Sequence, residues 1–332
     1  MTSQLTIPHG SVFLAPMEGI TDESYRLVVE QSFGGWDFYG TDFLRVPAAG
    51  RYPRKYLLDH FGKTIYQSPL KDKTFYQILT SYNAFTEEIL SDLNELSFDW
   101  IDLNLGCPSK TVCKNGGGSS LLRDLPRLTG LIKLIRKNIK GFFSVKVRIG
   151  YHDGKDFIEL IKMLNDQGAQ LITVHARTRD QMYKEPADWS YIKSAVQNSN
   201  VPIIGNGDLW NQTDIKTMFE QTGCHGVMLG RGAMKQPWIA RHYKQKIDLD
   251  QNDIIQHIFI FFRAYIHEVQ KRGMFERGLV KQLKSLSRFM FEDLNQGEII
   301  RREILLSHSS VEILEKIKTI AEKEELSVMH LS

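Results

Sequence analysis

The sequence predicts an α/β protein that consists of a (β/α)₈ barrel and a C-terminal all-helical domain. Eight short apolar runs of strand length recur through the first two-thirds of the chain. Segments with helical periodicity separate most of these runs, and after Gly230 the helical periodicity continues without further strand signals. A chain of 332 residues is long enough for one such barrel and a smaller module. We expect the barrel to span residues 1–244 and the helical domain residues 245–332.

The eight predicted strands are apolar runs bounded by turn-forming residues, at 12–17, 38–44, 74–79, 100–105, 143–149, 171–176, 202–206 and 226–229. The clearest crossover helices are predicted at 81–96, 125–139, 156–167 and 213–221. The stretch 47–73 shows no clear long helix, so we expect an extended loop with short turns there. In the C-terminal domain, helices are predicted at 254–269, 277–291, 298–306 and 310–325.

The composition is that of a soluble globular protein, with 42% hydrophobic and 24% charged residues. No apolar stretch approaches the ~18 residues of a membrane span, and the N-terminus lacks the basic start and apolar core of a secretory signal. Three cysteines are an odd number in a long chain, which argues against a disulfide framework, and the absence of a Cys-x-x-Cys pair argues against a structural metal site. We therefore expect a cytoplasmic monomer with no metal and no membrane partner.

A single thiol, Cys107, stands where the apolar strand at 100–105 breaks into a loop that contains three consecutive glycines, 116–118. Chemistry in α/β proteins usually sits at such strand ends. Asn104 precedes the thiol by three residues, and Gly106 between them lets the backbone bend closely. The alternative is a buried structural cysteine, since a free cysteine often behaves as a small hydrophobe. As a functional group, a thiol near its ordinary pKa of about 8.5 is mostly protonated at neutral pH and suits a general acid.

Polar side chains gather at the ends of the other predicted strands, which is where a barrel places its active site. Buried strands rarely keep such groups without a ligand that satisfies them. The polar strand-end residues are Glu18, Gln77, Asn104, Lys146, Arg148, His175, Arg177, Asn206, Asp208 and Arg231. Gly207, Gly230 and Gly232 flank the last two strands and permit close approach of a phosphate to the backbone, with Arg231 beside it. Each glycine turn alone is more often a plain turn, but two of them on adjacent strands, together with the other polar residues, indicate a phosphorylated cofactor.

Lys146 shares one strand face with Ser144 and Arg148. An inward lysine is compatible with a Schiff-base nucleophile, a phosphate ligand or a partner for an electron-rich flavin ring, and the alternative is a solvated lysine. His175 is either a ligand-binding residue or a satisfied core histidine.

Four cations recur on one predicted helix face in the C-terminal domain, at Arg277, Lys281, Lys284 and Arg288. From Lys271 to Arg288 there are six basic residues and one acidic residue. Such a stripe is either a solvated face or a contact surface for nucleic-acid phosphates. The net charge of the whole chain is only +3, so this excess is local.

Five segments in the expected order resemble the tRNA-dihydrouridine synthases, and they include the specific Asn-x-Gly-Cys-Pro element. They are Ala-Pro-Met-Glu-Gly at 15–19, Asp-Leu-Asn-Leu-Gly-Cys-Pro-Ser at 102–109, Val-Lys-Val-Arg at 145–148, Val-His-Ala-Arg-Thr at 174–178, and Asn-Gly-Asp at 206–208 with Gly-Arg-Gly at 230–232. The resemblance covers about residues 12–242. It implies an FMN-bearing (β/α)₈ barrel with a helical tRNA-recognition domain. It also implies reduction of a D-loop uridine with NADPH, or alternatively NADH, as the electron source.

The resemblance also implies roles for single residues. Hydride would pass from flavin N5 to C6 of the uracil, and Cys107 would protonate C5. Tightly bound FMN would contact Pro16, Met17, Glu18, Gln77, Lys146, His175, Asn206, Gly207, Asp208, Gly230 and Arg231. The RNA or its uracil would contact Arg45, Asn104, Arg148 and Arg177 in the barrel, and Arg277, Lys281, Lys284 and Arg288 on the basic helix. Whether Lys281 or Lys284 corresponds to the family's basic helix contact stays open.

Glu18 and the segment 41–46 resemble the bacterial C-type branch, which acts on uridine 16 of tRNA. Leu105 departs from that branch, which often has Cys there. Four readings follow: a uridine-16 enzyme, an enzyme of the same family acting on uridine 17 or 20, a flavin barrel that reduces a free pyrimidine, and a non-catalytic tRNA-binding protein. The basic stripe argues against a free pyrimidine, because a small substrate needs no such surface.

Overall fold

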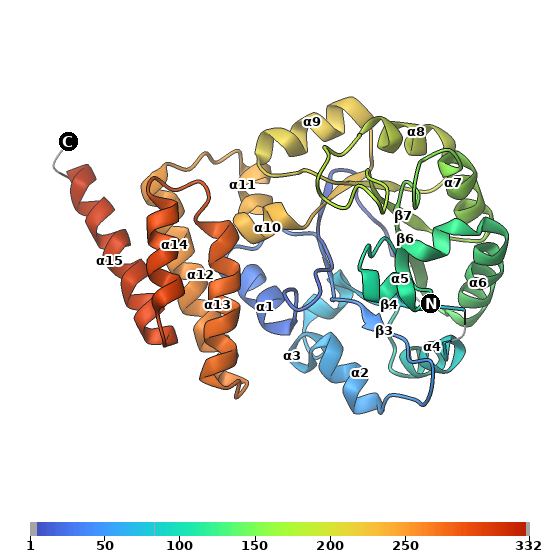
Figure 1. Cartoon of the computed structure of the whole chain (residues 1–332), viewed down its shortest axis with the longest axis horizontal. Helices are drawn as coiled ribbons and strands as arrows, with labels where there is room; N and C mark the ends of the chain where they lie inside the picture. Colours follow the sequence, from blue (N-terminus) through green and yellow to red (C-terminus); the bar gives the residue numbers. More distant parts are fainter. Residues whose placement is uncertain (1–4, 83, 330–332) are drawn as a thin grey trace. The chain divides into compact units, whose positions relative to one another are not determined.

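The computed structural model describes residues 5–82 and 84–329 and contains the predicted closed barrel of parallel strands (Figure 1). The strand order is β2-β1-β9-β8-β7-β6-β5-β4-β3, and a further β2–β4 pairing closes the sheet. The strands are β1 (Ser11–Leu14), β2 (Phe38–Gly40), β3 (Leu44–Arg45), β4 (Thr74–Leu79), β5 (Trp100–Leu105), β6 (Phe142–Arg148), β7 (Leu171–His175), β8 (Ile203–Asn206) and β9 (Gly226–Leu229). The predicted (β/α)₈ class is therefore confirmed.

The predicted second strand, 38–44, is divided into two short strands. Both β2 and β3 pair with β4, β2 with its first two residues and β3 with its last two. The two pieces thus share one of the eight barrel positions. Thr41 lies in the interruption between them, and its hydroxyl oxygen accepts a hydrogen bond from the backbone amide of Gln77 at 3.0 Å.

The α-helices described before residue 250 are α1 (Glu23–Ser32), α2 (Arg54–Phe61), α3 (Lys63–Tyr66), α4 (Thr86–Glu95), α5 (Lys110–Lys114), α6 (Leu125–Asn138), α7 (Phe157–Asp166), α8 (Ser190–Asn198), α9 (Gln212–Thr222), α10 (Arg231–Lys235) and α11 (Ile239–Gln245). The four predicted crossover helices correspond to α4, α6, α7 and α9, and their ends differ from the predicted ones by at most five residues. Two 3₁₀ helices, η1 (Pro69–Lys73) and η2 (Gly118–Arg123), complete this part of the chain.

The expectation of an extended loop at 47–73 is wrong, because α2, α3 and η1 lie there. Helix α2 has only eight residues and buries only Leu57 and Phe61, so its apolar periodicity is a single repeat. Gly62, at φ +105°, ends it. Glu23 then accepts hydrogen bonds from the amides of Thr64 and Ile65 at the start of α3. This capping contact joins segments 41 residues apart, which local periodicity does not reveal.

The chain forms two compact units. The barrel unit comprises the residues up to Glu23, Asp37–Leu209 and Thr213–Gly230, and the helical unit comprises Ser24–Trp36, Trp210–Gln212 and the residues from Arg231 onward. The helical unit thus begins before the expected boundary at 245, since α10 packs against a C-terminal helix, α13. It also includes most of α1, whose Tyr25 hydroxyl donates to the Ala233 carbonyl at 3.0 Å.

The C-terminal helices of this unit are α12 (Gln251–Lys271), α13 (Glu276–Met290), α14 (Gly297–Leu306) and α15 (Ser310–Met329). A capping box starts α12, in which the Asp250 side chain accepts from the Asp253 amide at 2.8 Å. Apolar side chains on α12, α13 and α15 fill the space between these helices. No helix within the described residues is long and apolar enough to span a membrane.

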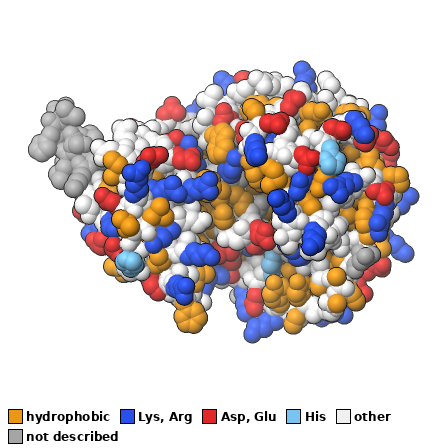
Figure 2. All heavy atoms as spheres, viewed as in Figure 1, with side chains coloured by type: hydrophobic (Ala, Val, Ile, Leu, Met, Phe, Trp, Pro, Cys, Tyr) orange, Lys and Arg blue, Asp and Glu red, His pale blue; other side chains and the backbone are white. Residues whose placement is uncertain are grey.

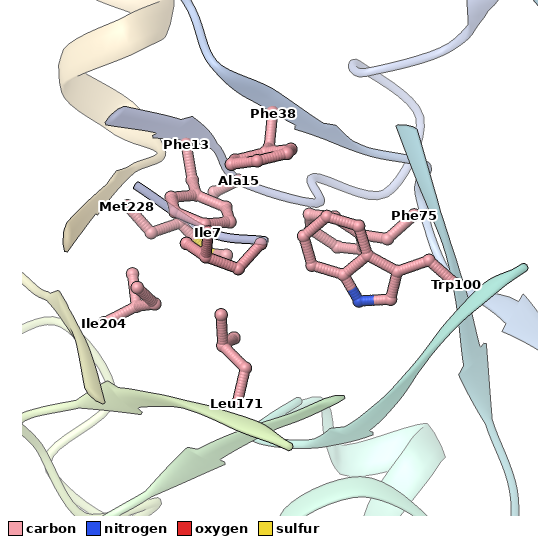
Figure 3. Packing of buried hydrophobic residues seen from close by; sticks show 9 residues of the cluster. All are labelled: Ile7, Phe13, Ala15, Phe38, Phe75, Trp100, Leu171, Ile204 and Met228. Carbon is pink, nitrogen blue, oxygen red and sulfur yellow. The ribbon is translucent and has the colours of Figure 1, made fainter. Parts of the chain in front are cut away.

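An apolar floor closes one end of the barrel interior. Inward side chains from several strands and from the segments just before and after β1 converge there, as Figure 3 shows: Ile7, Phe13, Ala15, Phe38, Phe75, Trp100, Leu171, Ile204 and Met228. Phe13 and Trp100 meet edge to face, with ring centroids 6.3 Å apart. Since side chains of a strand alternate between its two faces, the residues two and four positions further along β4 to β8 also face inward, nearer the carboxyl ends. Apart from Leu79 on β4, those positions are polar: Gln77, Asp102, Asn104, Ser144, Lys146, Thr173, His175 and Asn206.

Candidate active site

The inward positions beyond the floor form a ring of polar side chains at the carboxyl ends of the strands. Strand register pairs Gln77 with Asp102, Asp102 with Ser144, and Asn104 with Lys146. It also pairs His175 with Asn206 on the next two strands. Active sites of (β/α)₈ enzymes lie at this end of the barrel. The structure therefore brings together the predicted site residues of β4 to β8.

A chain of buried hydrogen bonds crosses this ring. The Trp100 indole donates to Ser144 Oγ at 2.8 Å, and the Ser144 hydroxyl donates to Asp102 Oδ1 at 2.5 Å. The Gln77 amide nitrogen donates to Asp102 Oδ2 at 2.7 Å, and its oxygen accepts from the Asn104 amide nitrogen at 2.8 Å. Each of these side chains is at most 8% exposed. We call this chain of contacts the carboxylate relay.

The carboxylate relay has one direction, because an ionised carboxylate only accepts hydrogen bonds. Asp102 thereby requires Gln77 to present its amide nitrogen, so the Gln77 oxygen faces Asn104. Asn104 in turn presents its nitrogen to Gln77 and its oxygen to the opposite side. That oxygen accepts from the backbone amides of Gly106 at 3.0 Å and Cys107 at 2.8 Å. The buried carboxylate thus orients the amide that fixes the cysteine.

The backbone of Cys107 is held by hydrogen bonds at both its amide and its carbonyl group. Asn104 binds its amide, while its carbonyl accepts from the Ser119 hydroxyl at 2.8 Å and the Ser119 amide at 3.2 Å. Gly118, at φ +57°, brings Ser119 there, and a side chain at Gly118 would meet the Cys107 carbonyl at 2.9 Å. Burial raises the pKa of the half-buried Cys107 thiol, with Glu18 adding to the rise. The thiol is therefore protonated at neutral pH, which is the state a general acid needs.

Lys146 is half-buried in the ring. Its ammonium group forms no hydrogen bond or ion pair with any residue that the structure describes. Burial, assisted by the charge of Arg148, lowers its pKa to about 8, although Asp102 acts in the opposite direction. Burial also raises the pKa of Asp102 to about 6, against the hydrogen bonds from Ser144 and Gln77. An unpaired cation in a polar ring fits an anionic or electron-rich ligand.

Replacing Lys146 by methionine should remove one pH dependence of stability. The folded pKa of Lys146 is about 8 and its ordinary value is 10.5, so between these pH values the unfolded chain holds a proton that the folded chain has lost. Stability then rises with pH across this window. In urea unfolding from about pH 7 to 10.5, the free energy of unfolding of wild type minus that of Lys146→Met should rise. A flat difference would contradict the burial of the ammonium, and Lys137→Met on α6 is the matched control.

Arg148 and Arg177, predicted to meet the RNA or its uracil, are buried and engaged within the barrel unit. Arg148 is 1% exposed and donates to the carbonyls of Gly106, Thr178 and Met182 at 2.9, 2.8 and 3.1 Å. Arg177 is 2% exposed and pairs with Asp208, and its Nη1 lies 3.2 Å from His175 Nε2. Both guanidinium groups thus brace the loop that follows β7. A contact with RNA stays a prediction for each.

The loop after β8 carries the predicted Asn206, Gly207 and Asp208. Asn206 donates to the Met228 carbonyl at 2.6 Å, which links β8 to β9. Gly207 adopts φ +120°, and a side chain there would meet the Ala187 Cβ at 2.8 Å, so only glycine fits without a shift. Gly230 ends β9, and an added side chain would be in ordinary contact with Met17 Sδ at 3.6 Å. These residues can bring backbone amides close to a phosphate.

The remaining predicted cofactor residues lie in two places. Pro16 packs closely against Gly40, since a Cβ added at Gly40 would lie 2.6 Å from the Pro16 ring. Met17 and Glu18 follow Pro16 in the sequence. Glu18 Oε1 lies 3.9 Å from Arg45 Nη2, and both side chains are exposed. Arg231 belongs to the helical unit, where its guanidinium lies 4.5 Å above the Trp210 ring.

Sequence reasoning missed Asp102 and Ser119 as site residues. Asp102 is two positions before Asn104 on an alternating strand, so its inward direction was predictable from that spacing. Ser119 reaches Cys107 only because the loop folds back over 12 residues. No local pattern signals that contact.

The predicted basic stripe lies on α13, opposite the buried face formed by Leu279, Val280, Leu283, Leu286 and Met290. Arg277, Lys281 and Arg288 are exposed, and Lys284 is half-buried. Figure 2 shows Lys and Arg side chains gathered over α13. Within the described part of the chain, no carboxylate pairs with these four cations.

Comparisons with known proteins agree with this architecture. The sequence profile of the family "Dihydrouridine synthase (Dus)" matches residues 13–325. The chain is 33% identical to the tRNA-dihydrouridine(16) synthase of Cupriavidus necator, over 73% of this chain and 76% of that protein. It is 34% identical to the probable tRNA-dihydrouridine synthase of Helicobacter pylori, over 69% and 68% of the two chains.

A structural likeness supports the fold alone. The solved structure of histamine dehydrogenase from Rhizobium sp. 4-9 superposes with a TM-score of 0.55 at 11% identity, over 77% of this chain. The match spans 48%, about half, of that longer chain. The profile covers most of the sequence, and both relatives exceed 30% identity over two-thirds or more of the two chains. The chain therefore belongs to the dihydrouridine synthase family.

Proposed function

We propose that this protein reduces a D-loop uridine of tRNA, uridine 16, to 5,6-dihydrouridine with FMN as cofactor and NADPH as electron source. The observation that carries the proposal is the protonated thiol of Cys107, held by the carboxylate relay in the same polar ring as the unpaired ammonium of Lys146. Membership of the family supplies the reaction class.

The polar ring fits a flavin. Lys146 would lie against the electron-rich part of the ring system, where its unpaired charge stabilises added negative charge. One proton of the Gln77 amide nitrogen is committed to Asp102, and the second is available to a ring carbonyl. Asn206, Gly207, Asp208 and Gly230 would bind the ribityl phosphate region, with Pro16, Met17 and His175 along the ring. When bound, reduced FMN supplies the hydride for C6 of the uracil.

Cys107 completes the reduction by donating its proton to C5 of the uracil. Burial keeps the thiol protonated until the substrate arrives, and the contacts from Asn104 and Ser119 fix the backbone that aims it. The target uridine must leave its stack, because an enzyme reaches the 5,6 bond of a base only after the nucleotide is extruded or single-stranded.

Uridine 16 is favoured over uridines 17 and 20 by two features. Relatives such as that of Cupriavidus necator are named for position 16. Glu18 and Arg45, both in segments that resemble the C-type branch, lie 3.9 Å apart at the exposed rim of the site.

The decisive experiment maps dihydrouridine in tRNA from a strain that lacks this gene. We expect loss at position 16 alone, restored by the wild-type gene. Loss at position 17 or 20 instead would correct the substrate position. Purified protein should be yellow, and with NADPH it should convert a tRNA transcript but not free uracil. Colourless protein that binds tRNA without converting it would contradict the proposed chemistry.

A further inference from the structure

The connection between α12 and α13 presents an aromatic ring to solvent. Phe275 is 88% exposed, and Met274 beside it is 37% exposed. Among the described residues, the Phe275 ring contacts no other ring or cation. Leaving this much apolar area in water is unfavourable, by about 25 cal/mol per Å². Exposure of the Phe275 ring to water is therefore unfavourable, and no ring or cation within the described residues covers it.

Phe275 also has no capping role that explains its side chain. It occupies the N-cap position of α13, where Ser, Thr, Asp and Asn are preferred. Its side chain accepts no capping hydrogen bond, whereas its carbonyl accepts from the amides of Gly278 at 2.9 Å and Leu279 at 3.2 Å. An alanine at this position keeps that carbonyl. The side chain can therefore be removed without loss of the helix start.

Phe275 precedes Arg277, the first cation of the basic stripe, by two residues, so its backbone lies at the N-terminal end of the stripe. Arg277, Lys281, Lys284 and Arg288 extend from it along about 16 Å of helix. The one acidic residue of this segment, Glu276, is turned away, because its carboxylate accepts from the amide and hydroxyl of Ser310 at the start of α15. The result is a surface with an aromatic tip and uncompensated cations, which we call the α13 surface.

This combination fits one kind of partner, an RNA segment with an unpaired base. Single-stranded nucleotides present flat faces that stack on aromatic side chains and phosphates that pair with cations. The core of a protein–protein interface is depleted of charged residues, so a protein partner of apolar character does not fit the four cations of this surface, although Leu306 on α14 and Val311 on α15 are exposed as well. Loops of folded RNA are also where stacking recognition concentrates.

We propose that Phe275 stacks on an unpaired base of the tRNA while the cations of the α13 surface contact the adjoining phosphates. This inference rests on the proposed function for the identity of the RNA. Stacking and charge contacts differ in their salt dependence. Each phosphate contact steepens the fall of affinity with salt, whereas a stacking contact does not release counterions.

The test measures binding of an unmodified tRNA transcript to the full chain at several KCl concentrations. Phe275→Ala should weaken binding by about fivefold to a hundredfold at every salt concentration, with an unchanged slope of log affinity against log salt. Phe275→Trp should restore affinity. Arg277→Ala should instead lower the slope by about one. The matched control is Leu306→Ala, which removes another exposed apolar side chain, 73% exposed, from α14.

Wild-type affinity in Phe275→Ala would overturn the inference, and so would a wild-type dimer in light scattering that this substitution dissolves. These outcomes are separate from a failure of the proposed function. If wild type forms dihydrouridine while Phe275→Ala binds normally, only the stacking contact is refuted. If wild type binds through Phe275 but forms no dihydrouridine, the proposed reaction fails and the contact stands.

Discussion

The Cys107→Ala variant is expected to form dihydrouridine about 10²- to 10⁴-fold more slowly than wild type, the range that a positioned general acid contributes. The variant should still be yellow and should still oxidise NADPH, because the substitution leaves Lys146, Gln77 and the loop after β8 in place. Single-turnover conversion of a tRNA transcript by the prereduced enzyme measures the loss directly.

Cys107→Ser and Cys113→Ala distinguish loss of the acid from a disturbed loop. A serine hydroxyl fits the same space but is a much weaker acid than a thiol, so Cys107→Ser should be nearly as slow as Cys107→Ala. Cys113 is half-buried, and its Sγ lies 3.8 Å from the backbone carbonyl of Cys107. Cys113→Ala should keep most of the wild-type rate. Full activity of Cys107→Ser would exclude the thiol as the proton donor.

The barrel was predictable because each strand can be recognised from its own residues, without knowledge of distant contacts. Runs such as β5 and β9 match the predicted ranges at both ends, since a strand buried on both faces is a continuous apolar run with clear boundaries. Helices α2 and α3 were not predicted, because α2 has one apolar repeat and α3 depends on Glu23 from a distant segment. The division of the chain into units likewise depends on packing between α10 and α13, which no local pattern encodes.

The candidate site was predictable as a set of residues but not as a set of contacts. Polar residues at strand ends must meet in a barrel, so Gln77, Lys146 and Asn206 could be assigned to one ring from sequence. The sequence did not reveal that Arg148 would donate to loop carbonyls or that Arg177 would pair with Asp208. Those partners lie in loops, whose backbone path the sequence pattern does not predict. Nor did it reveal the direction of the hydrogen bonds in the carboxylate relay. That direction depends on Gln77 and Ser144, which lie opposite Asp102 on the two neighbouring strands.

Asn104→Ala is the second variant with a large expected effect, because this side chain joins the carboxylate relay to Cys107. The change removes the acceptor for the amides of Gly106 and Cys107 and the donor to Gln77. A misplaced reacting group costs about 10²-fold in rate, so we expect a loss of that order in single-turnover dihydrouridine formation. Asn138→Ala, which removes an amide on α6 outside the ring, should have the wild-type rate.

The pH dependence of Cys107 alkylation separates positioning from a direct contact with the uracil. Burial raises the pKa of this thiol, so loosening its loop in Asn104→Ala should lower that pKa and move the alkylation profile to lower pH. Asn104→Asp keeps an acceptor for the Cys107 amide but adds a negative charge, which should move the profile to higher pH. If Asn104 acted only by touching the uracil, neither profile would move and the loss would appear in the KM for tRNA. Opposite shifts in the two variants would establish that Asn104 positions Cys107.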